Sequence, residues 1–300
     1  MRKFTAAVAL LAALFIASTA QGADIIQPYI LASNNTSNLE NSIAETLEKL
    51  QEGGFEIAGQ YSPFTDTNII VVTNDTLKAI AAKSKRSGYA AGQRVAVNRV
   101  GGKVEVSYIN PVYIQYAYRL DGNMQAVQDQ LKASLGYIKA YGVEKTKTTA
   151  KKLKKYHYMF GMQYFDDPSE LAKFKSHQQA VTATKEALNK EGDALSLVYR
   201  IDIPGSEQTV FGVSMKATND DESDLDDAFQ MSIVDFQGPK KNAYLPYEIL
   251  VTGNQVEALH MRFRMAVHFP DLSMMGDNSF MKLMSSPKAI EKALEGLFED

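Results

Sequence analysis

Hydrophobic residues recur every three or four positions in several segments, which is the pattern of helices that bury one face. The first such segment begins at the capping box Ser37-Asn-Leu-Glu40 and ends at Gly53-Gly54, glycines that are typical of a helix C-terminus. The same spacing predicts helices at about 75–86, 124–135, 167–192 and 286–297. Amphipathic helices are therefore expected along the whole chain after residue 37.

Runs rich in β-branched and aromatic residues predict strands between these helices. Single runs lie at 55–61, 68–73, 156–165, 194–203 and 208–216. Two further pairs each contain a two-residue turn: Arg94 through Gly101-Gly102 to Pro111, and Tyr247 through Gly253-Asn254 to Pro270. The turn-to-proline spacing is 10 residues in the first pair and 17 in the second. We therefore expect the last strand of the second pair to be longer, bulged or interrupted.

The order helix, two strands, intervening segment, two strands, helix occurs twice. The intervening segment is the 75–86 helix in the first copy and the acidic stretch 219–227, read as a solvated loop rather than a calcium site, in the second. This order predicts an α+β fold, a duplicated module of antiparallel strands with helices packed on one face and an approximate twofold between the copies. The expected modules are 37–140 and 167–300, joined by a lysine-rich connector and strand at 141–166.

Residues 1–22 have the pattern of a secretory signal: Arg2-Lys3, an apolar core, and small residues before a cleavage point. The apolar core is too short to span a membrane, so we expect a mature chain that is periplasmic or secreted, without membrane insertion. The chain has no cysteine, which excludes disulfides and thiol chemistry. Its net charge of −3 gives no electrostatic basis for binding nucleic acid.

Three motifs carry a resemblance to a known family. They are Gly54-Phe55 at the first strand, VAVNRVGGKVEVSYINP at 95–111 and LPYEILV at 245–251. With these motifs the chain resembles the domain of unknown function 302 family of small bacterial proteins, in two divergent copies. The resemblance implies an α+β fold and no established biochemical role. The family often has Pro-Cys before the strand, where this chain has Pro246-Tyr247, so any role of that cysteine is absent here.

The stretch 255–269, read as a strand, holds the candidate site. One face of that strand would carry His260, Arg262, Arg264 and His268. Paired arginines match the oxygens of carboxylate or phosphate groups, which predicts an anion site. The alternative is that this face lies between the modules, with Arg264 neutralised by Glu105 or by the 220–227 carboxylates.

Methionine and histidine offer a second kind of site. Thioether and imidazole ligands suit copper, and the candidate ligands are His260, His268, Met274 and Met275. Met261 and Met265 would lie on the opposite face of the strand, which is more simply explained as core. Six lysines between 145 and 155 predict a solvated connector, with anion binding as the alternative.

No common catalytic motif occurs in the chain, neither a nucleophile elbow, nor a phosphate loop, nor a zinc-protease helix, nor a dinucleotide fingerprint. We therefore assign no catalytic residue and expect no cofactor. The predicted function is that of an exported, non-catalytic binding or accessory protein for a small anionic ligand or a protein partner. Two alternatives stay open: a periplasmic copper- or haem-binding protein, and a hydrolase of unfamiliar type. The oligomeric state stays open as well.

Overall fold

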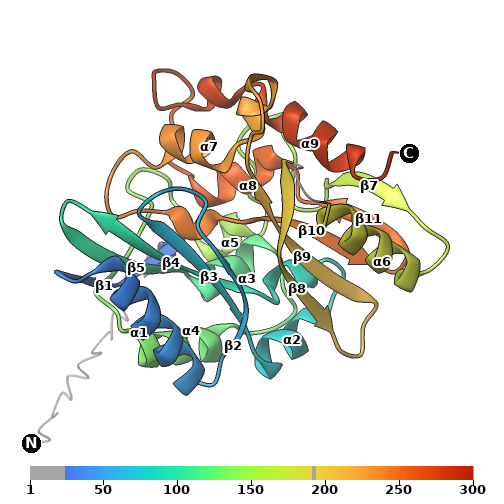
Figure 1. Cartoon of the computed structure of the whole chain (residues 1–300). Helices are drawn as coiled ribbons and strands as arrows, with labels where there is room; N and C mark the ends of the chain where they lie inside the picture. The colour runs from blue at the N-terminus through green and yellow to red at the C-terminus, as the bar shows by residue number, and fades with distance from the viewer. Residues whose placement is uncertain (1–23, 191–193, 300) are drawn as a thin grey trace, which may run out of the picture.

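The computed structural model describes residues 24–190 and 194–299 (Figure 1). The predicted signal at 1–22 lies outside these residues. Strands and helices form two antiparallel sheets with helices packed against them, which confirms the α+β class. Within the described ranges, no helix combines the length and apolar character needed to cross a membrane.

The first sheet has six strands in the order β2-β3-β4-β5-β1-β6. These are β1 (Tyr29–Asn35), β2 (Glu56–Tyr61), β3 (Thr67–Thr73), β4 (Gln93–Val100), β5 (Lys103–Ile109) and β6 (Lys139–Tyr141). Every residue of β3 is buried, because this strand lies inside the sheet and both of its faces are covered. Gly101 and Gly102 both have positive φ and form the tight turn between β4 and β5.

The second sheet has five strands in the order β7-β11-β10-β9-β8. These are β7 (Ser169–Lys173), β8 (Leu195–Ile203), β9 (Gln208–Met215), β10 (Tyr247–Thr252) and β11 (Gln255–Ala258). If β6 is set aside, the strand order of the first sheet is repeated in the second, with β1 matched to β7 and β2 to β8. The β-bulges also recur: one in the β1–β5 pair and one in β7–β11, one in β2–β3 and one in β8–β9.

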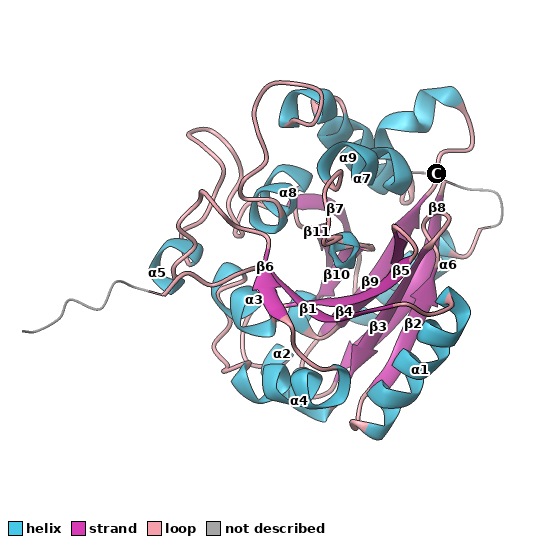
Figure 2. Cartoon of the chain, turned by 90° about the vertical axis from the view of Figure 1, so that its left-hand side faces the viewer, coloured by secondary structure: helices cyan, strands magenta, loops and turns pink. Residues whose placement is uncertain are grey.

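The helices follow the same repeated order. The first half contains α1 (Leu39–Glu52), α2 (Asp75–Ala81), α3 (Pro111–Ala117), α4 (Gln125–Leu135) and the short α5 (Ala150–Leu153). The second contains α6 (His177–Leu188), α7 (Asp227–Val234), α8 (Met261–His268) and α9 (Ser286–Gly296). Four 3₁₀ helices are η1 (Ser87–Ala90), η2 (Asp220–Leu225), η3 (Asn242–Tyr244) and η4 (Phe280–Leu283). Helices α1 and α4 lie on one side of the first sheet, and α7, α8 and α9 lie on the other (Figure 2).

The two halves cover each other through reciprocal contacts. Segment η1 of the first half packs on β9 and β10, while η3 of the second half packs on β3, β4 and β5. Just before η1, Arg86 Nε lies 2.7 Å from the Glu257 carboxylate on β11. In the opposite direction, the Lys240 backbone N–H before η3 donates to the Glu105 carboxylate on β5 at 3.0 Å. The matched strand order and these reciprocal contacts are consistent with a duplicated module.

The edge strands β2 and β8 also lie side by side and join the two sheets. Gly59 of β2 sits against the β8 backbone, where an added Cβ would be 2.3 Å from the Val198 carbonyl oxygen. Only a residue without a side chain fits this close approach. The sheets thus meet both at their edges and through the segments that cover their faces.

The prediction of one long strand at 255–269 is wrong for the residues after Ala258. Strand β11 ends at Ala258, and α8 begins at Met261. His260 caps this helix, because its Nδ1 accepts the Arg262 backbone N–H at 3.1 Å. In the first half α3 likewise follows β5, with Asn110 as its cap. The residue in the position of Pro111 is therefore Met261 and not Pro270, which explains the unequal spacing in the sequence.

Three other element predictions are also wrong. Residues 156–165 form turns and bends rather than a strand. The predicted helix at 167–192 begins only at His177, because Ser169–Lys173 pairs with β11 as strand β7. The acidic stretch of the second half is not a loop alone, since it forms η2 and the start of α7, where Asp227 is buried. β7 forms because β11 pairs with it, whereas the acidic stretch coils because its carboxylates accept nearby backbone N–H groups.

Candidate functional site

Arg264, the central residue of the predicted site, lies in a buried polar cluster between the two sheets. Its side chain has 0% exposure, and the Glu248 carboxylate on β10 is equally buried. Arg94 of β4 approaches the same Glu248 oxygen at 2.6 Å, and Arg264 Nη2 lies 3.7 Å from it. The Tyr199 hydroxyl donates to the other oxygen at 2.6 Å. One carboxylate thus holds two guanidinium groups that come from the two halves of the chain.

Aromatic rings and backbone carbonyls complete the surroundings of Arg264. Its guanidinium lies 4.8 Å from the ring centre of Tyr244 and 4.2 Å from that of Tyr247. Its Nη2 donates to the carbonyl oxygens of Tyr244 and Pro246, at 3.2 and 2.9 Å. Burial opposes the positive charge, but Tyr244 and Glu248 outweigh it, so the pKa of Arg264 lies above its usual value. Arg264 therefore stays charged, and its partner is Glu248 rather than Glu105 or the 220–227 carboxylates.

His268 lies beside this cluster and is also fully buried. Its Nε2 is 3.3 Å from the Tyr118 hydroxyl, and its Nδ1 has no hydrogen-bond partner among the described residues. Burial, together with the charges of Arg94 and Arg264, holds the pKa of His268 well below its usual value. With His268 neutral, the cluster contains two cations and one anion.

The four residues of the predicted site do not share one face, since the strand on which that expectation rested is a helix. Arg262 and Arg264 are two positions apart on α8 and therefore point in different directions. Arg262 is partly exposed and forms no salt bridge with a described carboxylate. Burial, and then the charge of Arg262, lower the pKa of the helix cap His260, although Glu291 acts against them. Ligand binding by His260, Arg262, Arg264 or His268 stays a prediction.

The residues predicted as copper ligands are placed in different surroundings. His268 is buried, whereas Met274 and Met275 belong to an exposed loop between α8 and η4. In the described part of the chain, no group of three or more His, Cys, Asp or Glu side chains is placed to hold a metal ion.

A basic depression lies where the first half joins the connector, and two of its residues, Lys154 and Lys155, belong to the lysine run at 145–155. It has a volume of about 750 Å³. Its lining residues are Arg119, Lys154, Lys155, His157, Tyr164, Asp166 and Asp167. Arg119 follows α3 with a left-handed φ of 53°, and its Nη2 forms a 3.0 Å ion pair with Asp166. Its Nε is buried without a partner among the described residues.

The carboxylates of this depression are already engaged within the protein. Burial acts to raise the pKa of Asp166, but the hydrogen bond from Arg119 and its other polar contacts outweigh burial and lower it. Asp167 accepts the backbone N–H of Tyr164 at 3.0 Å. In contrast, neither Lys154 nor Lys155 forms a salt bridge with a described carboxylate. The depression therefore presents two lysines to solvent beside a partly paired arginine.

His157 and Tyr164 form a fixed pair at the rim. The His157 Nδ1 lies 2.8 Å from the Met159 carbonyl oxygen, which can only accept, so Nδ1 carries the hydrogen. The Tyr164 hydroxyl is 2.9 Å from Nε2, and the two ring centres are 4.1 Å apart. The only sequence signal for this region was the lysine run at 145–155. Arg119 and His157 gave no signal, because they meet the lysines only in the folded chain.

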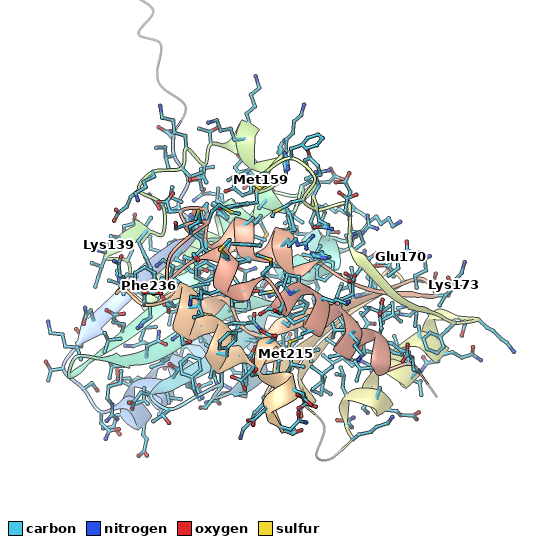
Figure 3. All side chains as sticks on the ribbon, turned by 90° about the horizontal axis from the view of Figure 1, so that it is seen from above. Lys139, Met159, Glu170, Lys173, Met215 and Phe236 are labelled. Carbon is cyan, nitrogen blue, oxygen red and sulfur yellow. The ribbon has the colours of Figure 1, made fainter. Side chains whose placement is uncertain are left out.

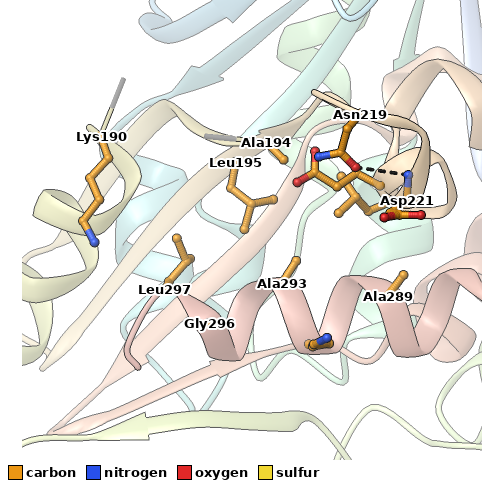
Figure 4. Close-up of a pocket in the computed structure, with 12 residues that line it drawn as sticks. Lys190, Ala194, Leu195, Asn219, Asp221, Ala289, Ala293, Gly296 and Leu297 are labelled. Atoms are coloured by element: carbon orange, nitrogen blue, oxygen red, sulfur yellow. Dashed lines mark hydrogen bonds between the residues drawn. The ribbon is translucent and has the colours of Figure 1, made fainter. Parts of the chain in front are cut away.

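Two other depressions contain no arginine: one has balanced charge, and one has three lysines and two carboxylates. One, of about 600 Å³, lies beside α9, where Ala289, Ala293 and Gly296 face it (Figure 4). Its charged lining residues are two lysines and two carboxylates: Lys190, Lys292, Asp221 and Glu222. Another, of about 370 Å³, lies between the halves, and its lining residues include Lys139 and Phe236, which are labelled in Figure 3. There the Asp271 carboxylate accepts the backbone N–H groups of residues 144–146 and so joins the halves.

No family model matches the chain, and no curated protein matches it. A similar solved structure is the crystal structure of an uncharacterized conserved protein DUF302 from Bacillus stearothermophilus. It is 16% identical, with a TM-score of 0.32, and the match covers 36% of this chain and 94% of that one.

Proposed function

We propose that this chain is an exported, non-catalytic binding protein that holds a small anionic ligand in the basic depression formed by Arg119, Lys154, Lys155 and His157. We also propose that its scaffold is two divergent copies of one domain of unknown function 302 module, related by an approximate twofold. The repeated strand order, the matched bulges and the reciprocal Arg86–Glu257 and Lys240–Glu105 contacts support the duplication.

One observation carries the ligand proposal: three cations line a single depression, and two of them have no carboxylate partner among the described residues. An arginine fork can bind two oxygens of a carboxylate or phosphate at once, and lysines add charge without fixed geometry. The buried, unpaired Nε of Arg119 is a further donor close to this site. The tyrosine and histidine rings give a ligand an apolar wall.

The buried cluster around Arg264 supports a structural role for the residues first chosen as the anion site. Its guanidinium is enclosed by Glu248, two tyrosine rings and two carbonyl groups. None of the three depressions described above is lined by Arg264 or His268. We therefore place the ligand at the connector and assign Arg264 to the joint between the halves.

Thermal unfolding with added anions tests the proposal. Inorganic phosphate and citrate are the probes, and potassium chloride at equal ionic strength is the salt control. Ligand at 100 times its Kd should stabilise the native state by about 2.7 kcal/mol. The triple variant Arg119→Gln, Lys154→Gln, Lys155→Gln should lose this stabilisation.

The matched control is Lys151→Gln, Lys152→Gln, two lysines of α5, which directly precedes Lys154 and Lys155 but does not line the depression. This double variant should keep the full anion response. Equal responses from the two variants, or no response from the wild type to either anion, would reject the site. A response to chloride as large as that to phosphate would show screening alone and would reject it as well.

A further inference from the structure

Four exposed methionines of the second half lie in one short segment, the loop 274–284 that includes η4. They are Met274, Met275, Met281 and Met284, which are 38%, 71%, 51% and 61% exposed. Elsewhere in the same half Met215, Met231, Met261 and Met265 are buried, as is usual for this residue. Core packing therefore explains the other methionines of this half but not those of the loop.

Backbone contacts bring three of these methionines together. The Phe280 N–H donates to the Ser273 carbonyl oxygen at 2.8 Å, and the next N–H, of Met281, lies 3.3 Å from the Met274 carbonyl oxygen. Met274 and Met281 are therefore neighbours across the loop. Met281 and Met284 are three positions apart around η4, with the Met284 N–H 3.3 Å from the Met281 carbonyl oxygen. Residues three apart in a 3₁₀ turn lie on the same side.

The base of the loop is fixed to the protein. Phe280 is buried and stacks on Tyr158, with ring centres 5.3 Å apart and planes at 14°. The Tyr158 hydroxyl donates to the Leu272 carbonyl oxygen at 3.2 Å. Ser279 and Leu283 are also buried. The methionines are thus held at the surface by a packed base.

We propose that the thioethers of Met274, Met281 and Met284, with Met275 as a fourth donor, bind one soft monovalent metal ion, Cu(I) or Ag(I). Thioether sulfur is a soft, uncharged ligand that selects such ions over hard cations. The site does not use His260 or His268. His268 is buried, and the Nδ1 of His260 accepts the N–H of Arg262. The site is separate from the anion site and independent of it.

Titration with silver nitrate, followed by NMR of ¹³C-methyl-labelled methionine, tests the proposal directly. One Ag(I) should bind per chain and shift the methyl signals of the loop methionines. The signals of the buried methionines should stay in place. Sodium nitrate and zinc nitrate should have no such effect, because both ions are hard or borderline.

The variant Met274→Leu, Met281→Leu, Met284→Leu keeps the apolar volume and removes only the sulfur atoms. The control is Met159→Leu, a similarly exposed methionine outside the loop (Figure 3). Loss of groups that only orient metal ligands lowers affinity by about 10–100-fold, so loss of three ligands should lower it at least as much. Met159→Leu should bind like the wild type. An unchanged Ag(I) affinity of the triple variant would overturn the site. So would silver-induced methyl shifts that occur only in methionines outside the loop.

Discussion

Replacing Arg264 by glutamine should strongly destabilise the free protein, whereas the same change at Arg262 should not. Arg264 is fully buried, lies 3.7 Å from Glu248 and donates to two backbone carbonyl groups. Breaking a buried ion pair costs about 3–5 kcal/mol, because the remaining polar groups stay buried without their partner. Glu248 keeps Arg94 at 2.6 Å, which places the expected loss near the lower end, at about 3 kcal/mol.

Urea unfolding followed by circular dichroism measures this difference. The midpoint should fall for Arg264→Gln at an unchanged m-value, since the surface exposed on unfolding is the same. Arg262→Gln is a matched control on the same helix and should change the free energy of unfolding by no more than about 0.5 kcal/mol. If the two variants have equal stability, the Arg264 cluster does not hold the halves together. If Arg264→Gln loses anion binding without losing stability, the ligand site lies at α8 and not at the connector.

Three further changes probe other parts of the structure. Leu294→Ala on α9 should lower the free energy of unfolding by about 2–5 kcal/mol, because the side chain is buried. Lys288→Ala should lower it little. Equal losses in urea unfolding would mean that the buried face of α9 is misassigned. Burial raises the pKa of Asp227 to about 7, so the folded state binds the proton more tightly than the unfolded state and stability falls as pH rises from about 4 to 7. Asp227→Asn should remove up to about 4 kcal/mol of this pH dependence, and identical stability-versus-pH curves for the variant and wild type would contradict it. Gly59→Ala should destabilise the protein by about 1–3 kcal/mol, because the added Cβ would meet the β8 backbone. Gly296→Ala has open space around it and should be neutral or stabilising. An unchanged stability of Gly59→Ala would argue against the contact between the sheets.

The sequence by itself determined the elements that have strong local signals. The amphipathic pattern after residue 37 predicted α1, although its cap is Asn38 and not Ser37 as the capping box implied, and the Ser286-Pro287 start predicted α9. The paired glycines at 101–102 and the Gly253-Asn254 turn predicted the two central hairpins. These signals are local because capping, turn geometry and periodic burial depend on residues a few positions apart. The α+β class followed from their order.

Tertiary structure alone decided the short elements and the partners of the buried charges. Residues 260–265 alternate polar and apolar side chains like a strand, but a cap at His260 and burial on nearly all sides make residues 261–268 a helix. Ser169–Lys173 is a strand because β11 offers it an edge. Arg264 and Arg94 are 170 positions apart in the chain and share one carboxylate only because the two sheets meet. A charge pair of this kind depends on the distance between the side chains in the folded protein, and the spacing of the residues along the sequence does not predict that distance.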